Sequence, residues 1–296
     1  MKKFLQPISG ISIILFAALF VSCNKGSTYN SANPYPTTTS KEIVLHSNAT
    51  LGNYLTDKNN RTIYVFSNDA NGTNTCTGGC EPFWPVFNVN NLTADQLGDG
   101  LSLSDFTTIT TASGKAQLAY KGWPLYQYAP VQNGTNVQEA AGQTNGEGFA
   151  GIWFVAKNDY SIMLANNQLT GGNGINYKSD YSVGNGLTTY FTDGSGKTLY
   201  IFTGDSLNIN KFTKPDLSNN NVWPVYENEL KSVPSIVDKT KFGSIDVAGK
   251  KQLTYQGWPL YHFGQDGTRG LNKGVSFPTP GLWHVSVKDN PSPPHS

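Results

Sequence analysis

The chain has 296 residues, with 21 basic and 20 acidic side chains and a formal net charge of +1. A near-neutral chain lacks the basic surface that nucleic-acid binding requires and the polybasic patch that attracts proteins to anionic lipid. Gly (31), Tyr (15) and Phe (15) are abundant, and this composition favours strands and tight turns over helices.

The first 22 residues have the pattern of an export signal. Lys2 and Lys3 precede an apolar run, residues 8–21, which ends before Ser22-Cys23. The run is too short for a comfortable membrane span, and a small residue before a cysteine resembles a bacterial lipobox. This resemblance implies cleavage after residue 22 and acylation of Cys23. The alternatives are a plain signal peptide, which would leave Cys23 unmodified, and an uncleaved anchor.

Residues 23–40 are rich in Ser, Thr, Asn, Gly and Pro and show no periodicity, so they are expected to form a flexible tether. Two or three acyl chains would anchor the protein stably to a membrane. No Asp follows Cys23, so retention at an inner membrane is not signalled. The expected location is the cell envelope, at the outer membrane of a two-membrane bacterium.

The body of the chain is a duplication. Residues 114–128 match residues 249–263 at ten of fifteen positions, and all six tryptophans fall into three matched pairs. The second copy carries an insertion rich in Gly, Asn and Ser at about 171–186. We therefore expect two tandem β domains, residues 41–160 and 161–290, followed by a tail, residues 291–296.

Short apolar runs bounded by turn residues, such as residues 63–66 and 199–202, predict strands. The segments 57–61 and 193–197 resemble hairpin loops. A long helical period is absent, so the predicted fold class is all-β, with each copy a sandwich or small barrel. Each copy also contains a fainter internal repeat, and a propeller-like closure of four units is the alternative.

The aromatic strands carry a motif, Tyr-x-[Phe/Trp/Tyr]-x-x-Asp, and the chain resembles the bacterial secreted-repeat lipoproteins described by it. A fourth strand, with Tyr126 and Tyr128, begins the motif but has Val131 in place of the aspartate. The resemblance implies export and an all-β repeat, and it supplies no agreed activity. The full matches are Tyr64, Phe66 and Asp69; Tyr200, Phe202 and Asp205; and Tyr261, Phe263 and Asp266.

The motif residues have structural and functional interpretations. An aspartate after a strand usually bonds its own downstream backbone N–H groups in an Asx turn; cation binding and acid catalysis are the alternatives. The alternating aromatic rings are expected in the core. If the face with Tyr64 and Phe66, or the one with Tyr126 and Tyr128, is exposed, it would instead offer a stacking surface for sugars.

Cys76 and Cys80 are the cysteines that remain beside Cys23. Outside the cytoplasm, a nearby pair is expected to form a disulfide, and Thr-Gly-Gly between them supplies the necessary bend. A redox-active pair and a metal site are the alternatives. The second copy lacks both cysteines, so no function common to the two copies requires them.

His262 and His284 replace Gln127 and Phe154 of the first copy, and both fall on late strands of the second copy. A metal or haem site there is an alternative to ordinary histidines, although no cofactor is predicted. The familiar nucleophile, phosphate-loop and zinc-protease motifs are absent. The favoured function is a non-catalytic envelope lipoprotein that binds an envelope protein or a carbohydrate. The second hypothesis is an envelope metal-binding, haem-binding or electron-transfer protein.

Overall fold

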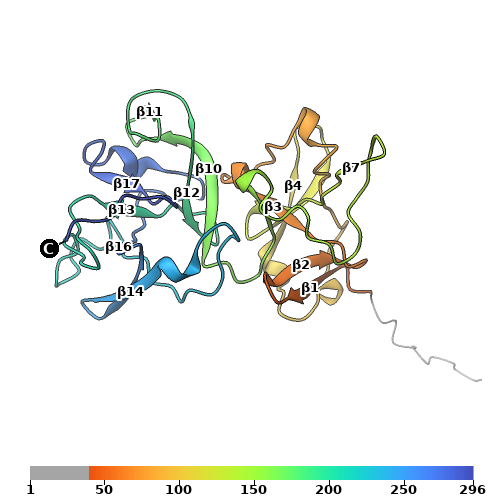
Figure 1. The fold of residues 1–296 in the computed structure, drawn as a ribbon, viewed down its shortest axis with the longest axis horizontal. Helices are drawn as coiled ribbons and strands as arrows, with labels where there is room; N and C mark the ends of the chain where they lie inside the picture. The colour runs from red at the N-terminus through yellow and green to blue at the C-terminus, as the bar shows by residue number, and fades with distance from the viewer. Residues whose placement is uncertain (1–39, 296) are drawn as a thin grey trace, which may run out of the picture. The chain divides into compact units, whose positions relative to one another are not determined.

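The computed structural model describes residues 40–295, and these residues form short strands without any regular α-helix (Figure 1). The all-β prediction is confirmed. Cys23 and residues 1–39 lie outside the described part of the chain. Within that part, no helix has the length and hydrophobicity to cross a membrane.

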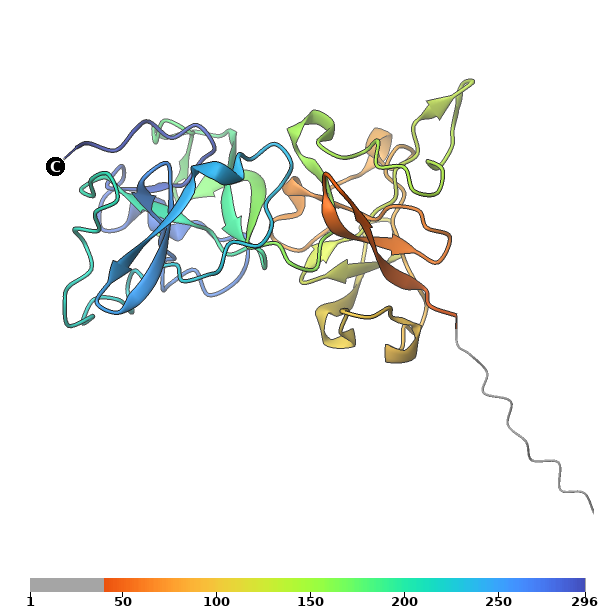
Figure 2. The ribbon, with the colours of Figure 1, turned by 60° about the horizontal axis from the view of Figure 1, so that its bottom comes forward.

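The first copy, residues 41–160, contains nine strands. Its longest hairpin opens the body, and its smallest, β7–β8, projects from the body (Figure 2). The strands are β1 (Ile43–Asn48), β2 (Gly52–Asp57), β3 (Tyr64–Phe66), β4 (Phe106–Thr110), β5 (Ala116–Tyr120), β6 (Trp123–Pro124), β7 (Val131–Gln132), β8 (Thr135–Asn136) and β9 (Trp153–Val155).

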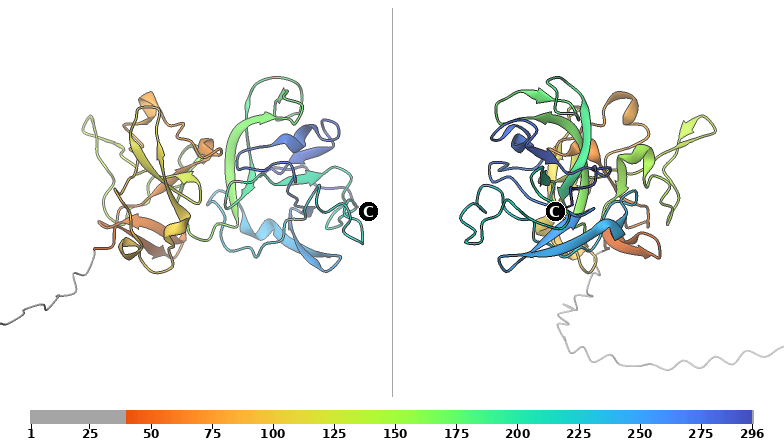
Figure 3. Two further views of the ribbon diagram at one scale, coloured as in Figure 1. Left: turned by 180° about the vertical axis from the view of Figure 1, so that it is seen from behind. Right: turned by 60° about the vertical axis from the view of Figure 1, so that its left-hand side comes forward.

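The second copy, residues 161–290, repeats this order without a β7–β8 equivalent. Its nine-residue β10 strand is the longest among the described residues and is drawn in bright green (Figure 3). The strands are β10 (Ile162–Thr170), β11 (Asn176–Tyr177), β12 (Leu187–Asp193), β13 (Tyr200–Phe202), β14 (Phe242–Val247), β15 (Lys250–Tyr255), β16 (Trp258–Pro259) and β17 (Trp283–Val285).

Short 3₁₀ turns connect several of these strands. They are η1 (Ser67–Asp69), η2 (Gly78–Cys80), η3 (Ala94–Gln96), η4 (Leu103–Asp105), η5 (Phe149–Gly151), η6 (Lys239–Lys241) and η7 (Lys273–Ser276).

The strands form small antiparallel sheets of two or three strands, and the sheets correspond between the copies. The β1–β2 pair corresponds to β10–β12, the β3–β9 pair to β13–β17, and the β4–β5–β6 sheet to β14–β15–β16. The insertion in the second copy adds β11 to the outer edge of β10. The duplication read from the sequence therefore extends to strand pairing.

Tight turns fix the register of the late hairpins. Lys121 and Gly122, between β5 and β6, have φ of 48° and 79°, and Gln256 and Gly257, between β15 and β16, have 51° and 81°. Two consecutive positive φ angles define the hairpin turn whose twist suits antiparallel strands, and glycine adopts the second at little cost. The late hairpins of the two copies therefore have the same turn geometry.

One continuous cluster of buried apolar side chains contains residues from both copies, from Ile43 to Val285. A second cluster, around Tyr64 and Trp84, lies in the first copy alone. The domain boundary near residue 160 stays a prediction.

Trp123 and Trp258, which the sequence matches to each other, are both buried, at 3% and 5% exposure. Trp123 Nε1 donates to the carbonyl of Gly194 in the second copy at 3.0 Å. Trp258 Nε1 donates instead to the carbonyl of Pro291 at 2.7 Å. The C-terminal tail thus accepts the hydrogen bond of Trp258, just as the second copy accepts the hydrogen bond of Trp123.

Candidate functional site

The two motif strands of each copy lie side by side. Tyr64 and Tyr126 exchange backbone hydrogen bonds of 2.8 and 2.9 Å, and Tyr200 and Tyr261 exchange bonds of 2.8 and 3.0 Å. A reciprocal pair of this kind has a local twofold axis between the two strands. The early and late motif strands, which form the fainter repeat within each copy, are therefore paired with each other at these tyrosines.

The tyrosine of each motif bonds the carboxylate of the opposite motif. Tyr261 Oη donates to Asp205 at 2.8 Å, and Tyr200 Oη donates to Asp266 at 2.5 Å. In the first copy Tyr126 Oη donates to Asp69 at 2.5 Å. In these pairs, the tyrosine and the aspartate of one motif are bonded to the opposite motif and not to each other.

Glu139 completes the fourth pair. Tyr64 Oη donates to Glu139, which also accepts from the backbone N–H of Asn145 at 3.0 Å. Val131, which stands where the motif has aspartate, is 52% exposed on β7. Glu139 lies outside the motif and was not among the predicted site residues; the missing aspartate at 131 was the signal that another carboxylate was required.

Each motif aspartate also bonds a backbone N–H further along its own loop. Asp69 accepts from Thr75 at 2.8 Å, Asp205 from Lys211 at 2.8 Å, and Asp266 from Lys273 at 2.9 Å. These bonds close loops of six or seven residues, longer than the Asx turn that was expected.

Burial raises the pKa of Asp69, Asp205, Asp266 and Glu139 to about 6, while the hydrogen bonds that each carboxylate accepts act in the opposite direction. All four side chains are at most 6% exposed. Since these groups have little access to solvent and bond tyrosines of the same copy, we interpret them as parts of the core.

We call the four hydrogen-bonded tyrosine–carboxylate pairs the crossed pairs. Two stacked tryptophans pack against the crossed pairs of each copy. The rings of Trp84 and Trp153 are 3.7 Å apart and nearly parallel, and those of Trp223 and Trp283 are 3.6 Å apart. Phe66 adds a third layer on Trp153 at 4.0 Å. The core interpretation of the motif aromatics is confirmed.

The alternative of an exposed stacking surface is wrong for the four rings that it named. Tyr64 and Tyr126 are fully buried, Phe66 is 6% exposed and Tyr128 is 9% exposed.

Cys76 and Cys80 form the expected disulfide, with their Cα atoms 5.3 Å apart. The carbonyl of Cys80 accepts from the backbone N–H of Trp84 at 3.0 Å, so the bridge holds the loop that carries this tryptophan. Cys76 is 1% exposed. The disulfide therefore positions part of the aromatic stack.

His262 and His284 have separate neighbours. His262 Nδ1 lies 3.1 Å from the Thr198 carbonyl, and its Nε2 lies 3.6 Å from Asp193. The ring of His284 stacks on Tyr181 at 4.1 Å. Burial lowers the pKa of both histidines.

Strand β13 separates the segment that carries His262 from β17, which carries His284, because Tyr200 bridges to Tyr261 on one side and pairs with Val285 on the other. Within residues 40–295, no group of three or more His, Cys, Asp or Glu side chains could hold a metal ion. No specific contact therefore favours the metal or haem hypothesis.

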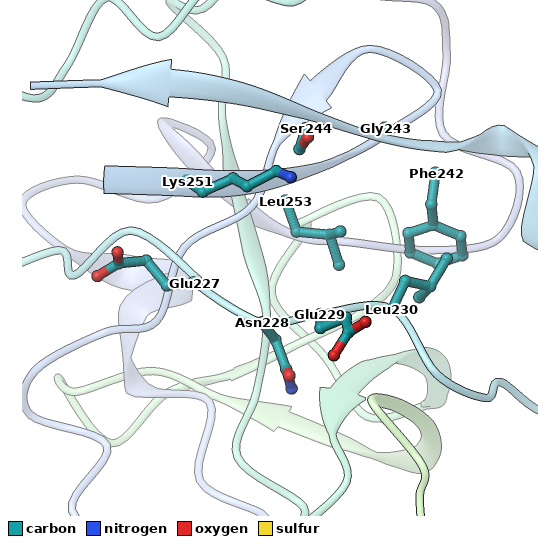
Figure 4. Close-up of a pocket in the computed structure, with 9 residues that line it drawn as sticks. All are labelled: Glu227, Asn228, Glu229, Leu230, Phe242, Gly243, Ser244, Lys251 and Leu253. Carbon is teal, nitrogen blue, oxygen red and sulfur yellow. The ribbon is translucent and has the colours of Figure 1, made fainter. Parts of the chain in front are cut away.

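The second copy contains a groove of about 480 Å³ (Figure 4). Alternate residues of a strand share a face, so Phe242 and Ser244 of β14 line it together with Lys251 and Leu253 of β15. The segment 227–230 forms the opposite wall. This volume falls in the range of about 300–1,000 Å³ that is typical of ligand sites.

The groove combines an apolar floor with charged edges. Leu253 is 4% exposed at the floor, whereas Glu227, on the wall, pairs with Lys250 at 2.6 Å. Among the described residues, no hydrogen-bond or ion-pair partner contacts the Glu229 carboxylate or the Lys251 ammonium. The groove can therefore cover an apolar group while offering one free carboxylate and one free ammonium.

Ser161 fixes the wall of the groove. Its hydroxyl donates to the Glu229 carbonyl at 2.7 Å and accepts from the Lys231 N–H at 2.8 Å. Tyr226 Oη donates to the Ser161 carbonyl at 2.6 Å. The wall is thus held in place by the first residue of the second copy.

The two copies differ at the groove. Gly243 and its cross-strand neighbour Thr254 correspond to Thr107 and Ala119. The smaller residue of the pair is therefore on β14 in the second copy and on β5 in the first. A β-carbon at position 243 would lie 3.1 Å from Thr254 Oγ1, which explains why glycine suits this position. The groove combines residues that the copies share, such as Phe242 and Leu253, with residues that they do not share, such as Lys251. It therefore has no signal of its own in the sequence.

Residues 107–157 match the family model described as a secreted repeat of unknown function. This match confirms the resemblance over the late strands of the first copy. No curated protein and no solved structure matches the chain significantly.

Proposed function

We propose, from the premise of a secreted repeat, that the protein is a non-catalytic, lipid-anchored module of the cell envelope that binds a partner polypeptide. The groove between the β14–β15 hairpin and segment 227–230 carries this proposal. The crossed tyrosine–carboxylate pairs would build the scaffold, and the groove would supply recognition.

The anchor is inferred from the lipobox-like sequence at Cys23 and the apolar run before it. Acylation at Cys23 and cleavage after residue 22 would leave the body tethered by residues 23–40, with the outer membrane of a two-membrane bacterium as its location. A Cys23→Ser variant should lose metabolic labelling with a radioactive fatty acid and leave the membrane fraction. Labelling that persists in Cys23→Ser would contradict the lipid anchor.

A polypeptide suits the groove better than a sugar does. Sugar rings favour exposed aromatic faces, whereas the floor contains aliphatic Leu253 and Leu230 beside a half-buried Phe242. Among the strands of residues 40–295, β14 pairs with β15 alone, so its other edge can bond an added strand. Glu229 and Lys251 would then contact charged side chains of that strand.

Photocrosslinking in living cells tests this proposal with a matched control. A photoreactive amino acid replaces Ser244, at the groove, or Thr108, which is opposite Leu118 as Ser244 is opposite Leu253. We expect a discrete protein adduct from position 244 and none from position 108. Mass spectrometry of the adduct identifies the partner.

Charge reversal then tests the groove itself. Glu229→Lys and Lys251→Glu should each reduce the adduct from position 244 several-fold while leaving the amount of folded protein unchanged, because both side chains are exposed. Equal adducts from positions 244 and 108 would contradict the groove. An adduct with glycan alone would favour the carbohydrate-binding alternative.

A further inference from the structure

A second cavity, of about 390 Å³, lies around Lys157, close to the end of the first copy. Residues 50–53, which include the end of the β1–β2 turn and the start of β2, line one side, and residues 231–239 line the other. The position that matches Lys157 in the second copy is Val287. The cleft is therefore separate from the groove and from the repeated core.

Lys157 is a buried cation without a direct partner. Its side chain lines the cleft, yet the residue is only 8% exposed. Among residues 40–295, no acceptor lies within hydrogen-bond or ion-pair distance of its Nζ, and the Tyr160 ring is 5.4 Å away. Burial lowers the pKa of Lys157, as expected for a charge removed from water.

Lysines outnumber carboxylates around the cleft. Asp159, which accepts from Ser232 Oγ at 2.7 Å, and Glu147, which accepts from the backbone N–H of Val155 at 2.5 Å, both attract Lys157 and offset part of the positive charge. Lys231 and Lys239 also line the cavity. Lys239 Nζ donates to the Lys231 carbonyl, which holds the two lysines close together.

The chemistry of these side chains indicates the ligand. None of the described residues that line the cleft is an arginine, the side chain that best fits a planar carboxylate through two parallel bonds. Lysine ammonium groups act as point charges and suit phosphate. Thr50, Ser232 and Ser235 add hydroxyl groups to the lining.

We propose that this cleft binds the phosphate group of a small molecule, with Lys157 as the buried counter-charge and Lys231 and Lys239 at the rim. The proposal is independent of the polypeptide partner at the groove, since the two cavities share no lining residue.

Calorimetry on the mature chain, with inorganic phosphate as the probe, tests the site. We expect saturable binding, at least tenfold weaker in Lys157→Met and several-fold weaker in Lys231→Ala. Lys214→Ala, at an exposed lysine outside the cleft, should bind as wild type does. Glycerol phosphate should bind and acetate should not. Unchanged phosphate affinity in Lys157→Met, or equal affinity for acetate, would overturn the proposal.

A labelling experiment needs no variant. A small amine-acylating reagent modifies the wild-type chain with and without phosphate, and mass spectrometry follows each lysine. Phosphate should slow acylation of Lys157 at least threefold and leave Lys214 unchanged. Equal protection of both lysines, or protection of neither, would show that phosphate does not occupy the cleft.

Discussion

The two copies hold the same tryptophan in place by different chemistry. In the first copy the Cys76–Cys80 disulfide closes the loop before Trp84. In the second, Asn219 stands where Cys80 would be, and its Nδ2 donates to the carbonyl of Phe212, at the place of Cys76, at 2.8 Å. A side-chain amide thus replaces the covalent bridge.

The backbone carbonyls of Cys80 and Asn219 each accept a hydrogen bond from the tryptophan that follows in the chain. Cys80 accepts from the N–H of Trp84 at 3.0 Å, and Asn219 accepts from the N–H of Trp223 at 3.4 Å. The loop must therefore hold its tryptophan, but the means of closing it is free to vary. The groove of the second copy and the Lys157 cleft, which residues of both copies line, are not part of this shared loop and are the candidates for specific binding.

The largest expected effect comes from removing a stacked tryptophan. Trp153→Ala and Trp283→Ala should each lower the free energy of unfolding by about 3–5 kcal/mol, the usual cost of truncating a large buried aromatic side chain. Trp283 is fully buried and Trp153 is 3% exposed. Urea denaturation monitored by circular dichroism measures the loss.

Comparing the two variants shows whether the copies unfold together. A single shifted transition in both variants would indicate one cooperative unit, as expected from the core cluster that contains residues of both copies. Two separate transitions in either variant would show that the copies fold independently. A loss below about 1 kcal/mol would contradict the packing role of the stack.

The pH dependence of stability tests the crossed pairs in both copies. Because burial raises the pKa of Asp69, Asp205, Asp266 and Glu139 to about 6, the folded protein keeps protons that the unfolded chain releases near pH 4. Stability from these groups is therefore present at low pH and is lost as the pH rises through about 6.

We expect the free energy of unfolding to rise between pH 7.5 and 5 by on the order of 1 kcal/mol for each carboxyl group. His262 and His284, whose pKa values are lowered, act in the opposite direction below about pH 6.5. Urea denaturation at the two pH values measures the balance, and Asp266→Asn should flatten the profile. Stability that falls steadily from pH 7.5 to 5 in the wild type would contradict the assignment.

Removing one carboxylate in each copy compares Asp266, a motif aspartate, with Glu139, which takes the place of one. Glu139→Ala and Asp266→Ala should each cost about 1–3 kcal/mol, because the buried hydroxyls of Tyr64 and Tyr200 lose their acceptors. Val131→Asp, which restores the motif in the first copy, should change stability by less than about 0.5 kcal/mol, since Val131 is exposed.

Denaturation midpoints with unchanged urea dependence measure these differences. If Val131→Asp rescued Glu139→Ala, the carboxylate at 131 would be able to reach Tyr64, and the exposed position of Val131 would not be the reason that Glu139 completes the pair.

The strands and turns could be predicted because their signals are local. Alternating aromatic residues indicate strands, and Lys121-Gly122 and Gln256-Gly257 stand where a hairpin needs positive φ. The duplication further reduced the problem, since a strand found in one copy located its counterpart. The disulfide followed from two cysteines with a flexible link between them.

The partners of the motif residues could not be predicted, because the sequence spacing within a motif hides a contact between motifs. Asp69 and Tyr126 are 57 positions apart, and Tyr64 and Glu139 are 75 positions apart. The groove depends on which face of β14 meets segment 227–230, and the Lys157 cleft joins three distant segments. Such sites are set by tertiary packing, which no local pattern encodes.

The smallest expected effects come from opening the loop before the stacked tryptophan, which the first copy closes with a disulfide and the second with a side-chain amide. Reduction of the Cys76–Cys80 bridge should cost roughly 2 kcal/mol, as the chain-entropy model gives for so short a loop. Asn219→Ala should cost about 1 kcal/mol, the net worth of a typical hydrogen bond. Urea denaturation with and without reductant measures both losses in one experiment. Asn219→Ala should keep the full response to reductant, because the affected loops lie in different copies and distant sites are additive. A response that disappears in Asn219→Ala would mean that the two loops stabilise a common element, and that the disulfide and the amide are not independent solutions to the same local problem.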